Sequence, residues 1–216
     1  MSAKNISGFL WIILILYFTY LMILLTIPYL SFQLNVDFLL TKQNIIHIKF
    51  WRLAFYAHIL TSVFVLLAGA FQFWEYFLIN FKKMHRFVGK VYVFLILLVS
   101  GPGALVMSFY ANGNAVSRTS FVLLSVLWIL FTALAFYFAL KRGFVKHRKF
   151  MIRSYALTLS AITLRAYALI LPNFVHFDAK DEYALIAWCS WTINLVLAEL
   201  FILTTNKSAL QKNFTP

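Results

Sequence analysis

Long apolar stretches separated by short polar segments dominate this sequence. Each is about as long as the roughly 20 residues that an α-helix needs to cross a bilayer core, whereas a barrel strand needs about ten alternating residues. The pattern therefore predicts an all-α protein, a polytopic transmembrane bundle of about six helices that forms a single domain over residues 1–216. The predicted helices are Gly8–Leu30, Leu53–Ile79, Val91–Tyr110, Thr119–Leu140, Ser154–Leu171 and Tyr183–Leu203.

Basic residues fix the predicted orientation of these helices. Most of the 19 lysines and arginines lie near the two ends, in the loop between helices two and three, and in the loop between helices four and five. Basic residues in short loops stay in the cytoplasm. We therefore expect both termini to be cytoplasmic.

The composition supports lipid as the solvent of this chain. Only 12% of the residues are charged and 63% are hydrophobic, whereas a soluble domain has about 25% charged residues. The net charge of +13 would suit nucleic acid, but the cations flank the apolar stretches instead of forming one basic domain. We expect no nucleic acid partner, and Cys189, the only cysteine, excludes an intrachain disulfide.

Two short segments with a common pattern predict an internal repeat. Phe77–Arg86 reads FLINFKKMHR and Ala139–Arg148 reads ALKRGFVKHR. Each follows an aromatic-rich helix and precedes another helix. Helices two and three are therefore expected to be a structural copy of helices four and five, in the same orientation.

Arg165 lies near the predicted centre of the bilayer. An arginine cannot lose its proton, and it is costly to expose to lipid, so it needs a partner. We expect Glu199 to be that counter-charge. Gln72 and Asn194 lie at comparable depths.

The third predicted helix contains Ser100-Gly101-Pro102-Gly103 at a similar depth. Pro102 is expected to kink this helix, and broken helices line binding sites in transporters. Tight helix packing explains the same features. The predicted buried polar cluster consists of Gln72, Ser100, Arg165, Asn194 and Glu199.

Four histidines suggest a cofactor, because paired neutral imidazoles ligate haem iron. The predicted haem b pairs are His85 with His147 on the inner side and His58 with His176 on the outer side. Arg86 and Arg148 follow the inner histidines and would bind haem propionates. The alternative is that both His-Arg pairs belong to a basic cluster that meets anionic lipid headgroups at the cytoplasmic face.

A series of short motifs runs through the middle of the chain. They are His58, Ala68-Gly69-Ala70-Phe71-Gln72, His85-Arg86-x-x-Gly89-Lys90-Val91-Tyr92, Ser100-Gly101, His147-Arg148-x-x-Met151-x-Arg153-Ser154 and Arg165. Together they resemble family 2306 among the domains of unknown function. Members of this family are predicted bacterial membrane proteins, so the resemblance implies a multi-pass protein of the bacterial inner membrane and supplies no activity.

Three functions are compatible with these features. The leading hypothesis is a haem-binding or redox-active membrane protein. The alternatives are a non-enzymatic carrier or receptor for a small anionic or lipidic molecule centred on Arg165, and a scaffold subunit with partners in a larger membrane complex. The sequence has no nucleotide-binding loop, HExxH zinc helix or nucleophile elbow, which argues against enzymes of those types.

Overall fold

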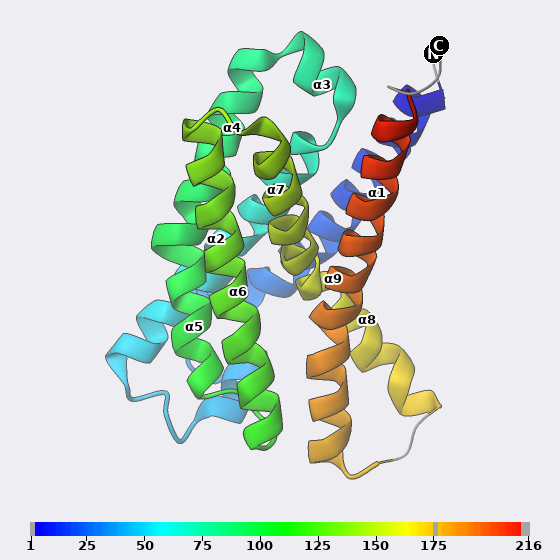
Figure 1. Ribbon diagram of the computed structural model, residues 1–216. Helices are drawn as coiled ribbons and strands as arrows, with labels where there is room; N and C mark the ends of the chain where they lie inside the picture. Colours follow the sequence, from blue (N-terminus) through cyan, green and yellow to red (C-terminus); the bar gives the residue numbers. More distant parts are fainter. Residues whose placement is uncertain (1–2, 175–176, 213–216) are drawn as a thin grey trace. The chain divides into compact units, whose positions relative to one another are not determined.

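The computed structural model describes residues 3–174 and 177–212, and its regular structure over these residues is helical (Figure 1). Six helical segments within this part of the chain are long and apolar enough to cross a membrane. These findings confirm the predicted all-α class and the number of spans. The segments are Gly8–Ser31, Lys49–Gln72, Lys82–Phe109, Ala115–Leu140, Phe144–Asn173 and Ala179–Thr205.

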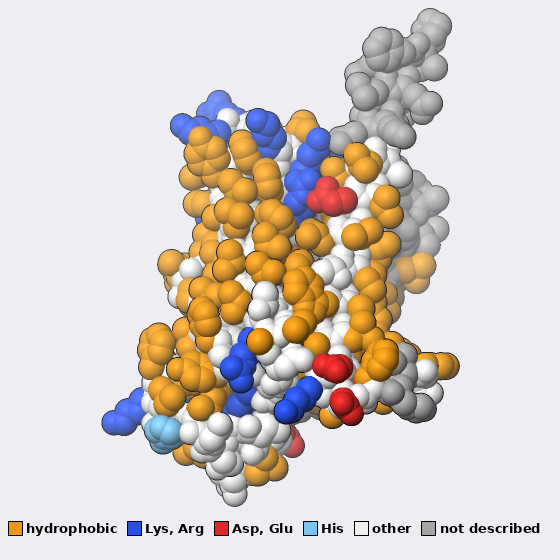
Figure 2. Space-filling view, turned by 60° about the horizontal axis from the view of Figure 1, so that its bottom comes forward, with side chains coloured by type: hydrophobic (Ala, Val, Ile, Leu, Met, Phe, Trp, Pro, Cys, Tyr) orange, Lys and Arg blue, Asp and Glu red, His pale blue; other side chains and the backbone are white. Residues whose placement is uncertain are grey.

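The chain divides into an N-terminal unit, Met1–Asn112, and a C-terminal unit, Gly113–Pro216. On the face drawn in Figure 2, hydrophobic side chains cover most of the surface and charged side chains gather in separate patches. A surface of this kind suits a lipid surrounding.

In the N-terminal unit, α2 (Lys49–Gln72) packs against α1 (Ala3–Thr26), α4 (Lys82–Phe94) and α5 (Gly101–Phe109). The short elements η1 (Ile27–Ser31) and η2 (Asp37–Lys42) connect α1 to α2, and α3 (Glu75–Asn80) connects α2 to α4. Tyr29, Leu39, Trp51 and Phe55 form a buried hydrophobic cluster in this unit.

The third span is interrupted by η3 (Leu95–Ser100), a π-helical segment directly before Gly101 and Pro102. In this segment the Gly101 N–H donates to the Ile96 carbonyl, one residue further back than in an α-helix. Pro102 lacks the N–H that an α-helix would require there. The predicted distortion is therefore present, but it takes the form of a wide turn ahead of the proline.

Close packing of α5 on α2 depends on Gly103. A Cβ atom at this position would lie 2.6 Å from the backbone oxygen of Ala54. The two helices therefore meet with their backbones in contact, as small residues allow in membrane proteins.

In the C-terminal unit, α6 (Ala115–Leu140) packs against α7 (Phe144–Thr158) and α9 (Ala179–Lys212), and α9 also packs against α8 (Ser160–Ile170). The short η4 (Leu171–Asn173) follows α8. Thus in both units a long helix, α2 or α6, precedes an interrupted one. The repeat and the cytoplasmic location of the termini stay predictions.

Buried hydrogen bonds join the helices of the C-terminal unit. Thr132 and Ser154 are 2.7 Å apart at their hydroxyl oxygens, and the Trp128 indole donates to the Thr158 hydroxyl at 3.0 Å. Ser154 and Thr158 of α7 therefore serve helix packing, as expected for interhelical hydrogen bonds in a membrane.

Candidate functional site

A bidentate ion pair joins α7 to α9. Arg153 Nε donates to Glu199 Oε1 at 2.5 Å, and Arg153 Nη2 donates to Glu199 Oε2 at 2.8 Å. The relative exposure of the two side chains is 20% and 41%. This is the fork-to-fork geometry in which arginine binds a carboxylate most specifically.

A second cation and an aromatic ring surround this pair. Lys149 lies one helical turn before Arg153 on α7 and acts electrostatically on the Glu199 carboxylate. The Arg153 guanidinium lies over the Phe150 ring, 5.1 Å from its centroid, where a cation is attracted to the ring face. The site thus holds two cations and one carboxylate.

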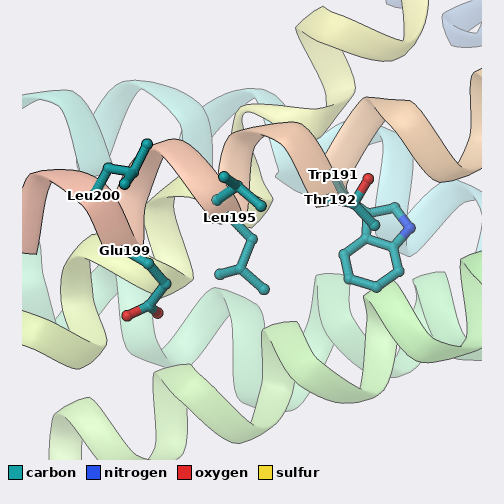
Figure 3. A pocket seen from close by; sticks show the side chains of 6 residues that line it. Trp191, Thr192, Leu195, Glu199 and Leu200 are labelled. Carbon is teal, nitrogen blue, oxygen red and sulfur yellow. The ribbon is translucent and has the colours of Figure 1, made fainter.

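A groove of about 390 Å³ runs along α9 and ends at Glu199. Its side chains belong to two adjacent rows on the helix, because they follow one another at intervals of four residues. In Figure 3, the Trp191 ring and the Glu199 carboxylate project from the same side of α9. The lining is mostly apolar and consists of Trp191, Thr192, Leu195, Val196, Glu199 and Leu200.

The Trp191 end of this groove is held in place by a hydrogen bond. The Trp191 indole Nε1 donates to the Ser120 hydroxyl on α6 at 2.9 Å, and the side chains of both residues are buried. The groove therefore has a rigid apolar end at Trp191 and a charged end at Arg153 and Glu199. Such a surface can accommodate a molecule with an apolar body and one charged group.

The predicted partner of Arg165 is wrong. Both carboxylate oxygens of Glu199 accept hydrogen bonds from Arg153, whereas Arg165 is exposed and its Nη1 donates to the Ala161 carbonyl at 2.7 Å. The prediction began helix five at Ser154, which placed Arg153 in a loop. The helix in fact begins at Phe144, so Arg153 is a helical residue that faces α9.

Asn194 supports the interruption between α7 and α8. Its Nδ2 donates to the Ala156 carbonyl at 3.2 Å and to the Thr163 hydroxyl at 3.1 Å. Ala156 lies in the last turn of α7, where carbonyl groups lose their helical partners. Asn194 therefore stabilises a broken helix from the neighbouring α9.

The remaining members of the predicted cluster, Gln72 and Ser100, belong to the N-terminal unit, so neither unit alone contains the whole cluster. Ser100 is buried, and both its carbonyl oxygen and its hydroxyl lie within 3.1 Å of His58 Nδ1. Gln72 packs against α4, because a Cβ atom added at Gly89 would lie 3.1 Å from Gln72 Oε1.

The histidines of the haem hypothesis occupy different environments. A carbonyl can only accept, so His58 Nδ1 donates to the Ser100 carbonyl at 3.0 Å and His147 Nδ1 donates to the Ala135 carbonyl at 2.8 Å. His85 lies in the first turn of α4, and Arg86 and Arg148 are exposed. His176 falls outside the described residues.

No group of three or more metal-binding side chains occurs among the described residues. A haem with two histidine ligands needs a smaller set. The two predicted histidine pairs therefore stay predictions.

Sequence reasoning missed Lys149 and Arg153 as site residues. Lys149 and Arg153 are four residues apart, so on a helix they share one face. This spacing, and the acidic Glu199 in the last predicted helix, could have indicated a charged contact between the two helices. Placing the helix boundary beyond them concealed that signal.

A family model described as "Predicted membrane protein (DUF2306)" matches residues 55–202. This match confirms the resemblance seen in the motifs and covers most of the chain. No curated protein and no solved structure matches the sequence.

Proposed function

The chain belongs to this family of predicted membrane proteins, and we propose that it is a carrier or receptor without enzymatic activity. Its ligand would be a lipidic molecule with an anionic headgroup. The observation that carries the proposal is the apolar groove of α9, which ends at Arg153 and Glu199. The binding site is centred on this ion pair rather than on Arg165.

The two ends of the groove suit the two parts of such a ligand. Leu195, Val196 and Leu200 would contact a hydrocarbon chain, and burial of apolar surface stabilises that contact. Glu199 compensates one of the two cations, Lys149 and Arg153, which leaves one positive charge for the headgroup. A carboxylate or phosphate is the group that these cations bind best.

The predicted orientation gives this ligand a source. Lys149 and Arg153 lie at the cytoplasmic end of their helix in that orientation, so the headgroup would lie at the inner surface of a bacterial inner membrane. The chain would then follow α9 from Glu199 towards Trp191, a distance of about 12 Å along the helix. A lipid of the inner leaflet has this direction.

Binding of radiolabelled oleate to the purified protein in zwitterionic nanodiscs tests this function. Leu195→Trp fills the groove and Arg153→Gln removes a cation, so each variant should weaken oleate binding about tenfold or more. Leu197→Trp is the matched control, because Leu197 is exposed on α9 and does not line the groove.

Two further measurements decide the outcome. Radiolabelled oleyl alcohol, which lacks the charge, should bind to the wild type more weakly than oleate does. It should bind equally to the wild type and to Arg153→Gln. Equal oleate binding by wild type, Leu195→Trp and Arg153→Gln would refute the proposed site.

Haem b binding is a second candidate, favoured by the hydrogen bonds of His58 and His147. Each ring donates from Nδ1 to a backbone carbonyl, which is how proteins orient the histidines that ligate metals through Nε2. Protein from haem-replete cells should then show a Soret band, and His147→Ala should weaken this band because it removes the inner haem. A colourless preparation that takes up no added haemin would refute this candidate.

A further inference from the structure

The connection between α2 and α4 carries an exposed surface of unusual composition. Here α2 ends at Gln72, α3 spans only Glu75–Asn80, and the chain turns again at Phe81, the residue before α4. Helix α3 is too short to cross a bilayer. It lies between two membrane spans, Lys49–Gln72 and Lys82–Phe109, and therefore at a membrane edge.

Exposed cations follow one row of α4. Lys82, Arg86 and Lys90 are separated by four residues each, and Lys83 lies beside them. The ion pair recorded among the described residues is Arg153–Glu199, so these four side chains have no carboxylate partner in that part of the chain. Like charges four residues apart on a helix repel each other, and a bound anion would relieve that repulsion.

Large apolar side chains alternate with these cations. Ile79, Phe81, Met84 and Phe87 have exposed fractions of 59%, 48%, 49% and 63%. Interleaved basic and bulky apolar residues are typical of segments that lie in the interface between headgroups and acyl chains. A nucleic acid or an acidic peptide would leave these apolar side chains in water.

Aromatic rings pack against one another on either side of α3. The Phe77 ring lies 5.6 Å from the Phe71 ring and 5.8 Å from the Phe81 ring, measured between centroids. Trp74 lies 5.5 Å from Tyr76 in the same way. These contacts connect α3 to the end of α2 and to Phe81, the residue directly before α4.

We propose that α3 and the part of α4 from Lys82 to Lys90 form a binding surface for the phosphate headgroups of anionic phospholipids. The cations bind the phosphate group, and Ile79, Phe81, Met84 and Phe87 contact the upper part of the acyl chains. This surface belongs to the N-terminal unit, so it does not depend on the groove of α9.

Brominated phosphatidylglycerol and brominated phosphatidylcholine can test this assignment in vesicles that contain the full chain. Trp74 reports on the surface, and its signal is obtained by subtracting the spectrum of Trp74→Phe. Each cation near a lipid surface contributes about a fivefold preference for an anionic lipid. The Trp74 fluorescence of the wild type should therefore be quenched at lower fractions of brominated phosphatidylglycerol than of brominated phosphatidylcholine.

The variant that carries Lys82→Gln, Lys83→Gln, Arg86→Gln and Lys90→Gln should lose most of this preference. The matched control neutralises four cations of the C-terminal unit and should retain it at Trp74. That control carries Lys141→Gln, Arg142→Gln, Lys146→Gln and Arg148→Gln.

Salt provides a test without mutation. Raising the ionic strength should reduce the preference of the wild type, because exposed charges are screened; a preference unaffected by salt would count against the proposal. An unchanged preference in the α4 variant, or an equal loss in the control, would overturn it. Competition by inorganic phosphate with no preference between the two lipids would assign the surface to free phosphate instead.

Discussion

The Arg153–Glu199 pair can be measured with a double-mutant cycle of Arg153→Gln and Glu199→Gln. Two unit charges about 4 Å apart interact by about 4 kcal/mol at an effective dielectric constant of about 20. The relative exposure of 20% and 41% and the loss of side-chain freedom reduce this value. A bidentate pair keeps more of its interaction energy than a pair joined by one hydrogen bond. We therefore expect a coupling energy of about 1–2 kcal/mol.

Equilibrium unfolding of the detergent-solubilised protein gives the free energies for this cycle. Each single variant should destabilise the protein, and the double variant should cost about 1–2 kcal/mol less than the sum of the two. A parallel cycle of Arg165→Gln with Glu199→Gln is the control, and its coupling should be near zero, since Arg165 donates to the Ala161 carbonyl. Additivity in the first cycle and coupling in the second would show that the partner of Glu199 is assigned incorrectly here.

Further substitutions test the packing and the topology. Gly103→Ala should lower the free energy of unfolding by about 1–3 kcal/mol, because the new Cβ would lie 2.6 Å from the Ala54 backbone oxygen. Gly143→Ala is the control, since its Cβ would meet the nearest atom at 3.5 Å and should be tolerated. Equal unfolding free energies of the two variants would contradict the close contact at Gly103. Asn194→Ala should lower the free energy of unfolding by about 1–3 kcal/mol, because the carbonyl of buried Ala156 loses its bond from Asn194, whereas the Thr163 hydroxyl keeps its bond to the Ser190 carbonyl. Thermal unfolding should show no such loss for Asn173→Ala, which removes bonds only to its own helix turn. Reporter fusions should read cytoplasmic after Lys82, Lys146 and Lys212 and external near Asn112 and Lys180, and a cytoplasmic signal near Asn112 would contradict the topology.

The membrane spans were predictable because their signal is long and continuous. Every predicted apolar stretch lies largely within one of the six helical segments, including the first, from Gly8. Lipid offers no hydrogen bonds to the backbone, so an apolar run of this length has few alternatives to a helix. Fold class therefore follows from composition and pattern.

The ends of helices and the partners of charged groups were harder to predict. The helix of Arg153 begins within a strongly basic segment at Phe144, where apolarity gives no signal. Pairing between distant residues depends on how α7 and α9 pack, and one sequence carries no record of that contact. For this reason Arg165 was recognised as needing a partner, but Glu199, which the sequence analysis assigned to it, pairs with Arg153 instead.

The π-helical turn of η3 also determines how far α5 is rotated about the helix axis relative to α4. One residue in a helix corresponds to a rotation of about 100°, and the extra residue in Leu95–Ser100 introduces that rotation between α4 and α5. Deleting one residue from the segment would restore α-helical winding and turn α5 by the same angle. Gly103 would then point away from Ala54, and a larger side chain would face the place where α2 tolerates none. The length of this segment is therefore under stronger constraint than the identity of its apolar residues.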